Sequence, residues 1–186
     1  DWDVHHGNGT QGIFYRDPDI VCCSLHQEAW YPGTGAVEEV GDGPAEGTTI
    51  NIPLPAGTGD GGYQHLFEEV VLPLLHAVAP PLIVVSAGFD AHHADPLGGM
   101  VMTARGFGRL ARSVREAAPA TPIVLLLEGG YDLSALAHSV AATLEGFTGI
   151  DARAEEGEAE VREGPFAAAQ ARARAVRRIV GAYWTL

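Results

Sequence analysis

The sequence contains no lysine, and its 24 acidic residues outnumber 11 basic ones, all arginine. A formal net charge of −13 disfavours binding to a phosphate backbone, so we expect no nucleic acid among the direct partners. Cysteine is nearly absent too, since only the adjacent pair Cys22 and Cys23 occurs. This spacing allows neither a disulfide framework nor a spaced thiolate metal site, and a reducing cytoplasmic location is the simplest expectation.

Long uninterrupted apolar runs are also missing. The longest apolar stretch, residues 70–88, is broken by Pro73, by His76 and by the pair Pro80 and Pro81. These breaks predict a helix followed by a strand rather than a membrane span, so we expect no membrane partner. The sequence opens without an initiating methionine or an apolar leader, and we interpret it as a fragment.

Strand-like and helical patterns alternate along most of the chain. Strand-like runs occupy residues 20–25, 48–52, 82–86 and 123–127. Helical spacing of apolar residues covers residues 63–78, 107–114 and 133–147. The alternation predicts an α/β fold with a mostly parallel sheet. The two later strand runs are continuously apolar, which predicts that both of their faces are buried.

The C-terminal part has a different composition. Residues 151–165 are rich in Glu, Ala and Gly and are predicted to form an acidic linker, and residues 166–186 carry an Ala- and Arg-rich helix. We interpret the arginines of that helix as a solvated face rather than a binding patch. The predicted organisation is therefore a main unit at residues 1–150, the linker and the C-terminal helix.

The first residues carry the densest polar pattern of the sequence. In an extended DWDVH segment, alternation points Asp1, Asp3 and His5 to one face and the apolar residues between them to the other. One face of this segment is therefore a cluster of carboxylates and an imidazole. On its own, such a D-x-H pattern more often reflects loop-capping aspartates and a core histidine.

Two further segments place polar side chains directly after a strand. Asp90 follows the first continuous apolar run, and Glu128 to Tyr131 follow the second. Parallel strands end at the same edge of a sheet, so these residues should lie beside the first segment. Asp3, His5 and Asp90 would supply two oxygens and one nitrogen and leave a position open, which suits catalytic zinc or ferrous iron. Three such strand ends together favour a metal site over the structural alternative.

Four ordered motifs, DWDVHHGNGTQ, SLHQEAWYPGTG, SAGFDAHHADPLGG and LEGGYDL, resemble the zinc-dependent histone deacetylase family in its class II-like form. The resemblance runs over about residues 1–149. It implies a three-layer arginase/deacetylase-type α/β fold whose N-terminal part is absent from this chain. It also implies hydrolysis of the amide of acetyl-lysine side chains, with Asp3, His5 and Asp90 as the zinc ligands. The hydroxyl of Tyr131 would then polarise the substrate carbonyl.

The resemblance assigns further positions. Those lining a narrow tunnel for the aliphatic part of the substrate are His6, Tyr31 and Leu97, and Gly130 would let the backbone approach the substrate closely. Those around a structural potassium ion behind the zinc are Asp1, Asp3, His5, Ser24 and Leu25. Ordinary roles stay open for several of them: a structural imidazole for His6, a loop aromatic for Tyr31 and a strand serine for Ser24. His92 and His93 are interpreted as loop structure, because the family pattern puts Asp90 on the metal.

One part of the family pattern does not occur in this sequence. Family members use a pair of adjacent histidines upstream of the D-x-D-x-H motif as general base and electrostatic partner. No residue precedes Asp1 here. We therefore expect residues 1–186 alone to be inactive. We also expect them to expose a hydrophobic sheet edge at the strand that carries Asp3 and His5.

Two other functions remain open at this point. An amidohydrolase for acetylpolyamines or other acyl-amines would use the same residues and would also suit an acidic protein. A catalytically silent acyl-lysine binder would be expected to lack Tyr131 or a metal ligand, and all four residues are present. The expected partner is thus an acetylated lysine or another acetylated amine, and the oligomeric state is undetermined.

Overall fold

The computed structural model describes residues 1–151, 164 and 166–185. Its strands are β1 (Cys22–Gln27), β2 (Thr49–Leu54), β3 (Ile83–Ala87) and β4 (Ile123–Leu127). Its α-helices are α1 (Asn8–Phe14), α2 (Asp60–Leu66), α3 (Leu72–Val78), α4 (Ala104–Ala117), α5 (Leu133–Thr148) and α6 (Phe166–Val180). The predicted strands and long helices are therefore present, with ends shifted by a few residues. The predicted linker lies outside the described residues, except at positions 151 and 164.

Pro73 does not end the helical stretch predicted over residues 63–78. The stretch consists of α2, a π-helical turn at Phe67–Val71 and α3, and Pro73 lies in the first turn of α3. Proline is tolerated there because its missing N–H is not needed at the start of a helix. A single 3-10 turn, Gly43–Ala45, precedes β2. No helix among the described residues is long and apolar enough to span a membrane.

The N-terminal segment, residues 1–5, bridges two two-stranded parallel sheets by backbone hydrogen bonds, and the whole layer is called the sheet below. β1 pairs with β2, and β3 pairs with β4. On one side of the segment, the N–H of Leu25 donates to the carbonyl of Asp1 at 3.0 Å. On the other side, the N–H of Trp2 donates to the carbonyl of Ser86 at 3.2 Å. The expectation of an open edge here is therefore wrong, because the segment uses backbone groups on both sides and lies in the middle of the sheet.

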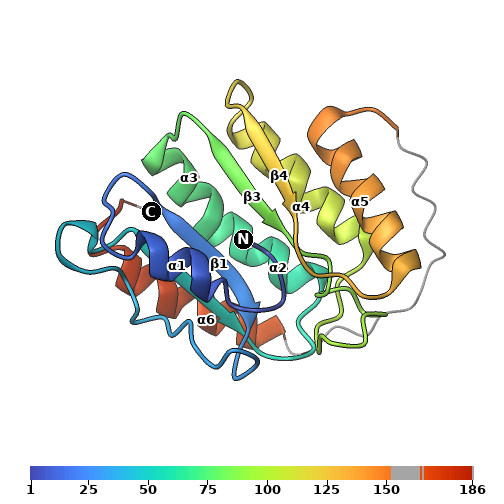
Figure 1. Cartoon of the computed structure of the whole chain (residues 1–186), viewed down its shortest axis with the longest axis horizontal. Helices are drawn as coiled ribbons and strands as arrows, with labels where there is room; N and C mark the ends of the chain where they lie inside the picture. The colour runs from blue at the N-terminus through green and yellow to red at the C-terminus, as the bar shows by residue number, and fades with distance from the viewer. Residues whose placement is uncertain (152–163, 165, 186) are drawn as a thin grey trace.

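Helices cover one face of this sheet (Figure 1), where α2, α3, α4 and α6 lie behind the strands. Trp2 points to that side and packs against Phe107 of α4 and Phe147 of α5, with ring centroids 6.4 Å apart in both pairs. The helix α6 packs on β2 and α2. Its apolar residues join the same hydrophobic core as the rest of the chain: Ala169, Ala173, Val176 and Val180.

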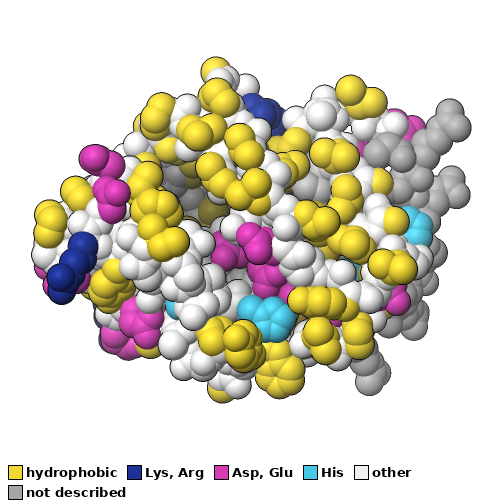
Figure 2. All heavy atoms as spheres, in the orientation of Figure 1, with side chains coloured by type: hydrophobic (Ala, Val, Ile, Leu, Met, Phe, Trp, Pro, Cys, Tyr) yellow, Lys and Arg dark blue, Asp and Glu magenta, His cyan; other side chains and the backbone are white. Residues whose placement is uncertain are grey.

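The opposite face of β3 and β4 is exposed and apolar. Val84 and Val124 are paired across the two strands and are 52% and 44% exposed, and Leu126 beside them is 49% exposed. Figure 2 shows hydrophobic side chains gathered over this part of the sheet. The prediction that both faces of these strands are buried is therefore wrong. Within the described residues, helices pack against only one of the two faces, where Val85 and Ala87 are buried.

Candidate metal centre

Three side chains from two strand ends meet on the open side of the sheet. Asp3 and His5 come from the N-terminal segment, and Asp90 comes from the loop after β3. One ligand atom from each residue lies within 4.8 Å of the other two. The Nδ1 atom of His5 is 3.0 Å from a carboxylate oxygen of Asp3 and 3.0 Å from one of Asp90. The structure thus brings together the three residues that the sequence nominated as metal ligands.

Backbone N–H groups fix the carboxylates of this cluster. The N–H of Val4 donates to Oδ1 of Asp90 at 2.8 Å, and the N–H of Gly129 donates to Oδ2 of Asp3 at 2.8 Å. The other oxygen of Asp90 faces His5, and the other oxygen of Asp3 accepts the backbone N–H of His5 at 2.8 Å and lies beside the His5 ring. Hydrogen bonds of this kind orient metal ligands before the ion binds.

The environment of Asp90 fits a bound cation. Its side chain is completely buried, and its Oδ2 atom accepts no hydrogen bond although His5 is close. Burial, and then the negative charge of Asp3, raise the pKa of Asp90. A buried carboxylate oxygen without a partner is unfavourable, and a divalent cation between these three residues would remove that penalty. Two oxygens and an imidazole nitrogen form a donor set that zinc and ferrous iron accept.

Two glycines next to the cluster have no side chain, and this gives the carboxylates the space that they occupy. A Cβ atom at Gly129 would clash with Oδ2 of Asp90 and would approach Oδ2 of Asp3 to 2.8 Å. A Cβ atom at Gly88 would clash with Asp3 as well. Only glycine allows the loops after β3 and β4 to come this close to the carboxylates. In this motif the sequence indicated Gly130 but not Gly129, because the role of Gly129 depends on a contact across 126 residues.

Two residues of the cluster, Asp3 and His5, line a hollow of about 430 Å³, and Asp90 is buried beneath them. Figure 2 shows acidic side chains at the centre of this face, with a histidine beside them and hydrophobic side chains around them. Tyr31, Leu97 and Tyr131 line the hollow. The ring of Tyr31 meets that of His5 edge-on, with centroids 6.1 Å apart. Three of the residues nominated for substrate contact or catalysis therefore surround the cluster.

The hydroxyl of Tyr131 is suited to donate a hydrogen bond. Its side chain is 53% exposed, and desolvation followed by the charges of Asp90 and Asp3 raises its pKa. A raised pKa keeps the phenol protonated at neutral pH. The preceding Gly130 has a φ of +137°, a backbone conformation that side chains other than glycine rarely adopt.

His6 is engaged in a polar network next to the cluster. It is buried, its Nδ1 lies 2.8 Å from Oγ1 of Thr34, and its Nε2 lies 2.9 Å from Oε1 of Gln11. It also borders the hollow that Asp3 and His5 line. Both ring nitrogens are thus used in a polar network, and its predicted contact with substrate stays a prediction.

Hydrogen bonds link some of the positions that were predicted to surround a potassium ion. The carbonyl of Asp1 accepts the N–H of Leu25, and Oδ1 of Asp1 accepts the N–H of Asp3 at 3.0 Å. The hydroxyl of Ser24 lies 3.0 Å from Nδ1 of His26. These contacts show that the N-terminal segment and β1 lie together. They do not test whether potassium binds there, so the potassium site stays a prediction.

The loop after β3 contains one further carboxylate, which the sequence analysis did not nominate. Oδ2 of Asp95 accepts the N–H of Tyr131 at 2.7 Å, and Oδ1 accepts the N–H of Leu97 at 2.8 Å. An Asp-Pro pair is a common turn signal, and that was the only local sign of this residue. His92 in the same loop is buried, and its Nδ1 accepts the N–H of Ala94 at 3.1 Å.

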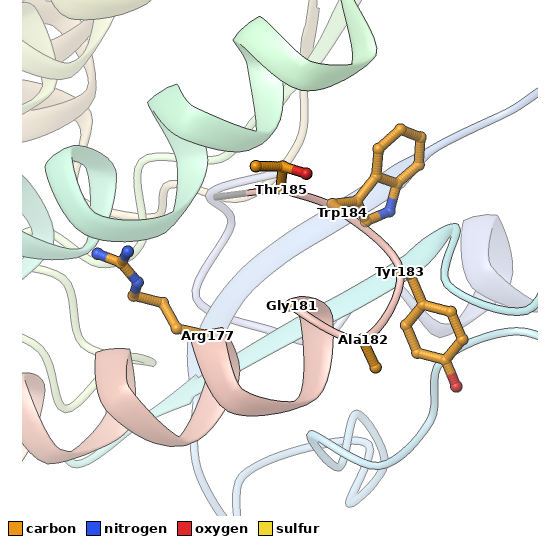
Figure 3. A pocket seen from close by; sticks show the side chains of 6 residues that line it. All are labelled: Arg177, Gly181, Ala182, Tyr183, Trp184 and Thr185. Carbon is orange, nitrogen blue, oxygen red and sulfur yellow. The ribbon is translucent and has the colours of Figure 1, made fainter.

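A second hollow, of about 450 Å³, lies beside the end of α6 and is lined by six residues from Arg177 to Thr185 (Figure 3). The chain turns back there beside β1 and β2. The indole N–H of Trp184 donates to the carbonyl of Gly47 at 2.7 Å, and the hydroxyl of Tyr183 donates to Glu46 at 3.1 Å. These contacts fasten the end of the chain to the loop before β2. Among the described residues that line it, the hollow holds no cluster of metal-binding groups.

Comparisons with known proteins agree with this geometry. The sequence profile of the histone deacetylase domain matches residues 1–147. Histone deacetylase 10, chloroplastic, of Oryza sativa subsp. japonica is 49% identical over 152 residues, which are 80% of this chain and 34% of that protein. Histone deacetylase 14, chloroplastic, of Arabidopsis thaliana is 44% identical over 159 residues, which are 84% of this chain and 38% of that protein.

A solved structure extends the match to the C-terminal helix. The crystal structure of the HDA15 HD domain superposes with a TM-score of 0.86 at 36% identity, over 99% of this chain and 49% of that one. The α/β fold with parallel strands is thereby confirmed. The match includes α6, for which the sequence analysis found no family motif. The chain spans about a third of the two curated relatives and about half of the solved domain.

Proposed function

The chain belongs to the histone deacetylase family, and from that premise we propose that the protein containing it hydrolyses the amide bond of acetylated lysine side chains. The metal would be Zn²⁺ or Fe²⁺, held by Asp3, His5 and Asp90. The observation that carries this proposal is the buried Oδ2 of Asp90, which accepts no hydrogen bond and lies 3.0 Å from Nδ1 of His5, near a hollow lined by His5 and Tyr131. The names of the relatives, which are histone deacetylases, support a lysine side chain as the acetylated group.

In this proposal, different residues of the chain orient the metal ligands, stabilise the oxyanion and bind the substrate. The ion, when bound, supplies Lewis acidity toward the amide oxygen and lowers the pKa of a water molecule. The N–H groups of Val4 and Gly129 keep the ligand carboxylates oriented. The protonated hydroxyl of Tyr131 donates a hydrogen bond to the oxyanion that develops on the amide carbonyl. The exposed side chains of Tyr31 and Leu97 offer apolar surface to the aliphatic part of the substrate.

Neither histidine among the described residues of the hollow is free to act as a general base. Two histidines line it, His5 and His6. His5 belongs to the metal cluster, and both nitrogens of His6 are engaged by Thr34 and Gln11. Positioned general acid–base groups contribute about 100-fold to 10,000-fold to turnover. We therefore propose that residues 1–186 on their own do not turn over substrate efficiently.

Steady-state kinetics of the natural protein that contains this chain test the proposal. We expect hydrolysis of an acetyl-lysine peptide to exceed that of acetylputrescine, and we expect Tyr131→Phe to lower kcat by about 100-fold to 1,000-fold because one oxyanion donor is lost. Tyr183→Phe removes a phenol hydroxyl that bonds Glu46 far from the cluster, and it should leave kcat unchanged.

Two results would contradict the proposal. Preferred hydrolysis of acetylputrescine would assign the chain to acyl-amine amidohydrolysis instead. A Tyr131→Phe variant with kcat within a few-fold of the unchanged protein would make Tyr131 a packing residue. Metal content and thermal stability measured on the same samples separate loss of the hydroxyl from loss of the fold.

A further inference from the structure

Asp95 connects the two loops that border the metal cluster. It lies in the loop after β3, and its side chain is buried, with 6% of the residue exposed. One carboxylate oxygen accepts the N–H of Tyr131 at 2.7 Å, 36 residues further along the chain. The other oxygen accepts the N–H of Leu97 at 2.8 Å within its own loop. A single buried carboxylate thus holds the backbone of two residues that line the hollow.

The backbone of Tyr131 depends strongly on this contact. The loop after β4 is fixed at Gly129, whose N–H donates to Asp3 and whose carbonyl accepts the N–H of Phe89 at 2.8 Å. Gly130 follows with a φ of +137°, and glycine gives the chain conformational freedom at that point. The next anchor along the chain is the bond from Tyr131 to Asp95. The phenol hydroxyl itself has no hydrogen-bond partner among the described residues, so its position follows from the backbone.

The chemistry of the side chain matters as well as its size. Two N–H donors face the two oxygens of Asp95, and a carboxylate can accept from both. An asparagine of the same shape has one acceptor oxygen, and its NH₂ group would face one of the two N–H donors. Hydrogen bonds to a charged acceptor are also shorter and about twice as strong as neutral ones.

We propose that Asp95 is a positioning residue, which holds the backbone of Tyr131 so that the phenol hydroxyl reaches the substrate carbonyl. This inference rests on the proposed role of Tyr131 in catalysis. Asp95 touches neither the metal ligands nor the substrate in this account, and it acts entirely through the loop that carries Tyr131. Its contact with Leu97 holds the apolar rim in the same arrangement.

A double-mutant cycle on the natural protein with its metal bound tests this. Asp95→Asn should lower kcat by about 10-fold to 100-fold, the penalty typical of a small misplacement of a catalytic group, while metal content stays unchanged. In a Tyr131→Phe background, the same substitution should change kcat by less than about twofold, because coupled residues are not additive. If Asp95→Asn does not fold, Asp95→Ser is measured in the same cycle.

Asp60 provides a matched control. It also accepts a backbone N–H, that of Thr103 at 2.9 Å, and it pairs with Arg109 on α4, but it does not contact the Tyr131 loop. Asp60→Asn should lower the melting temperature and leave kcat unchanged in both backgrounds. Loss of kcat in this control equal to that in Asp95→Asn would overturn the inference, because the effect would then be general destabilisation.

Amide hydrogen exchange gives a readout that does not depend on activity. Without substrate, exchange of the amides at residues 129–132 should be at least about tenfold faster in Asp95→Asn, and unchanged in Asp60→Asn. Unchanged exchange, or additive losses of kcat in the cycle, would overturn the positioning role and leave the proposed function intact. If Tyr131→Phe alone leaves kcat unchanged, the proposed function fails, and the positioning role falls with it.

Discussion

At the scale of single residues, three buried carboxylates at the candidate metal centre are oriented by backbone N–H groups. Asp3, Asp90 and Asp95 each accept at least one backbone N–H from a distant segment or from the next loop. His6 and His26 form a second buried group behind the N-terminal segment, with ring centroids 4.8 Å apart. Because such groups lose hydration on folding, their protonation is linked to stability.

His26 predicts a dependence of stability on pH. Its ring is buried, with Nδ1 near Ser24 and Nε2 donating to the carbonyl of Gly35 at 3.1 Å. Burial, and then the neighbouring His6, lower the pKa of His26 to about 4, against 6.5 in an unfolded chain. Below about pH 6.5 the unfolded state therefore binds a proton that the folded state does not bind until about pH 4. The stabilisation is complete above pH 6.5 and decreases as the pH falls to 4, by up to about 3 kcal/mol.

The measurement is the free energy of unfolding from denaturant titrations between pH 4 and pH 7. A His26→Gln variant keeps hydrogen-bonding groups at this position but does not titrate, so its curve should be flatter than that of the unchanged protein. Parallel curves would show that His26 does not contribute to the acid destabilisation.

At the scale of elements, close packing of α4 and α5 sets the position of both helices beside β3 and β4. Gly108 and Gly146 are buried where the two helices meet. A Cβ atom at Gly146 would clash with the carbonyl of Gly108 and would approach Cβ of Ala111 to 2.9 Å. In α1, a Cβ atom at Gly12 would have no neighbour within 4 Å.

The two glycines predict opposite effects of the same substitution. Gly146→Ala should destabilise the protein by about 1 to 3 kcal/mol, because the helices must move apart to make room for the methyl group. Gly12→Ala should stabilise it by about 0.5 to 1 kcal/mol, because alanine favours a helix and meets no obstacle. Thermal or denaturant unfolding of both variants checks this. Equal effects would show that backbone propensity, not interhelical contact, determines the role of Gly146.

The elements also show how far the sequence alone can predict this structure. The strand at residues 123–127 was predicted with its observed ends, because a continuous apolar run between turn residues is a local signal. The proximity of Asp3, His5 and Asp90 was also predicted, because each residue stands in a segment that the pattern places at the same edge of the sheet. The exposure of Val84 could not be predicted, because it depends on which elements cover the sheet. The roles of Gly129 and Asp95 were missed, because single hydrogen bonds between distant loops leave no periodic pattern.

At the scale of the whole molecule, the apolar face of β3 and β4 is the most conspicuous surface. Val84, Val124 and Leu126 are each more than 40% exposed on these two strands, and Figure 2 shows hydrophobic side chains gathered over this part of the sheet. Contiguous apolar surface of this kind promotes association. The surface that would cause this chain to self-associate is therefore an uncovered sheet face, rather than the open sheet edge that the sequence predicted.

We predict that residues 1–186 prepared alone associate with increasing concentration. The combined substitution Val84→Thr and Leu126→Thr should reduce this, because threonine keeps a strand-compatible shape and adds a hydroxyl to the exposed face. Leu133→Thr, at a residue 80% exposed on α5, serves as the control and should change little. Sedimentation velocity over a range of concentrations gives the result, and equal association in all three proteins would exclude this face as its cause.

The central claim is that Asp3, His5 and Asp90 hold a metal ion required for amide hydrolysis, and metal removal tests it most directly. In the natural protein containing this chain, chelation should abolish hydrolysis of an acetyl-lysine peptide, and about one equivalent of Zn²⁺ or Fe²⁺ should restore it. Asp90→Ala should retain little metal and should not be restored, because two ligands remain on an open site. Hydrolysis that persists in protein shown to be metal-free, or full metal content in Asp90→Ala, would contradict the account.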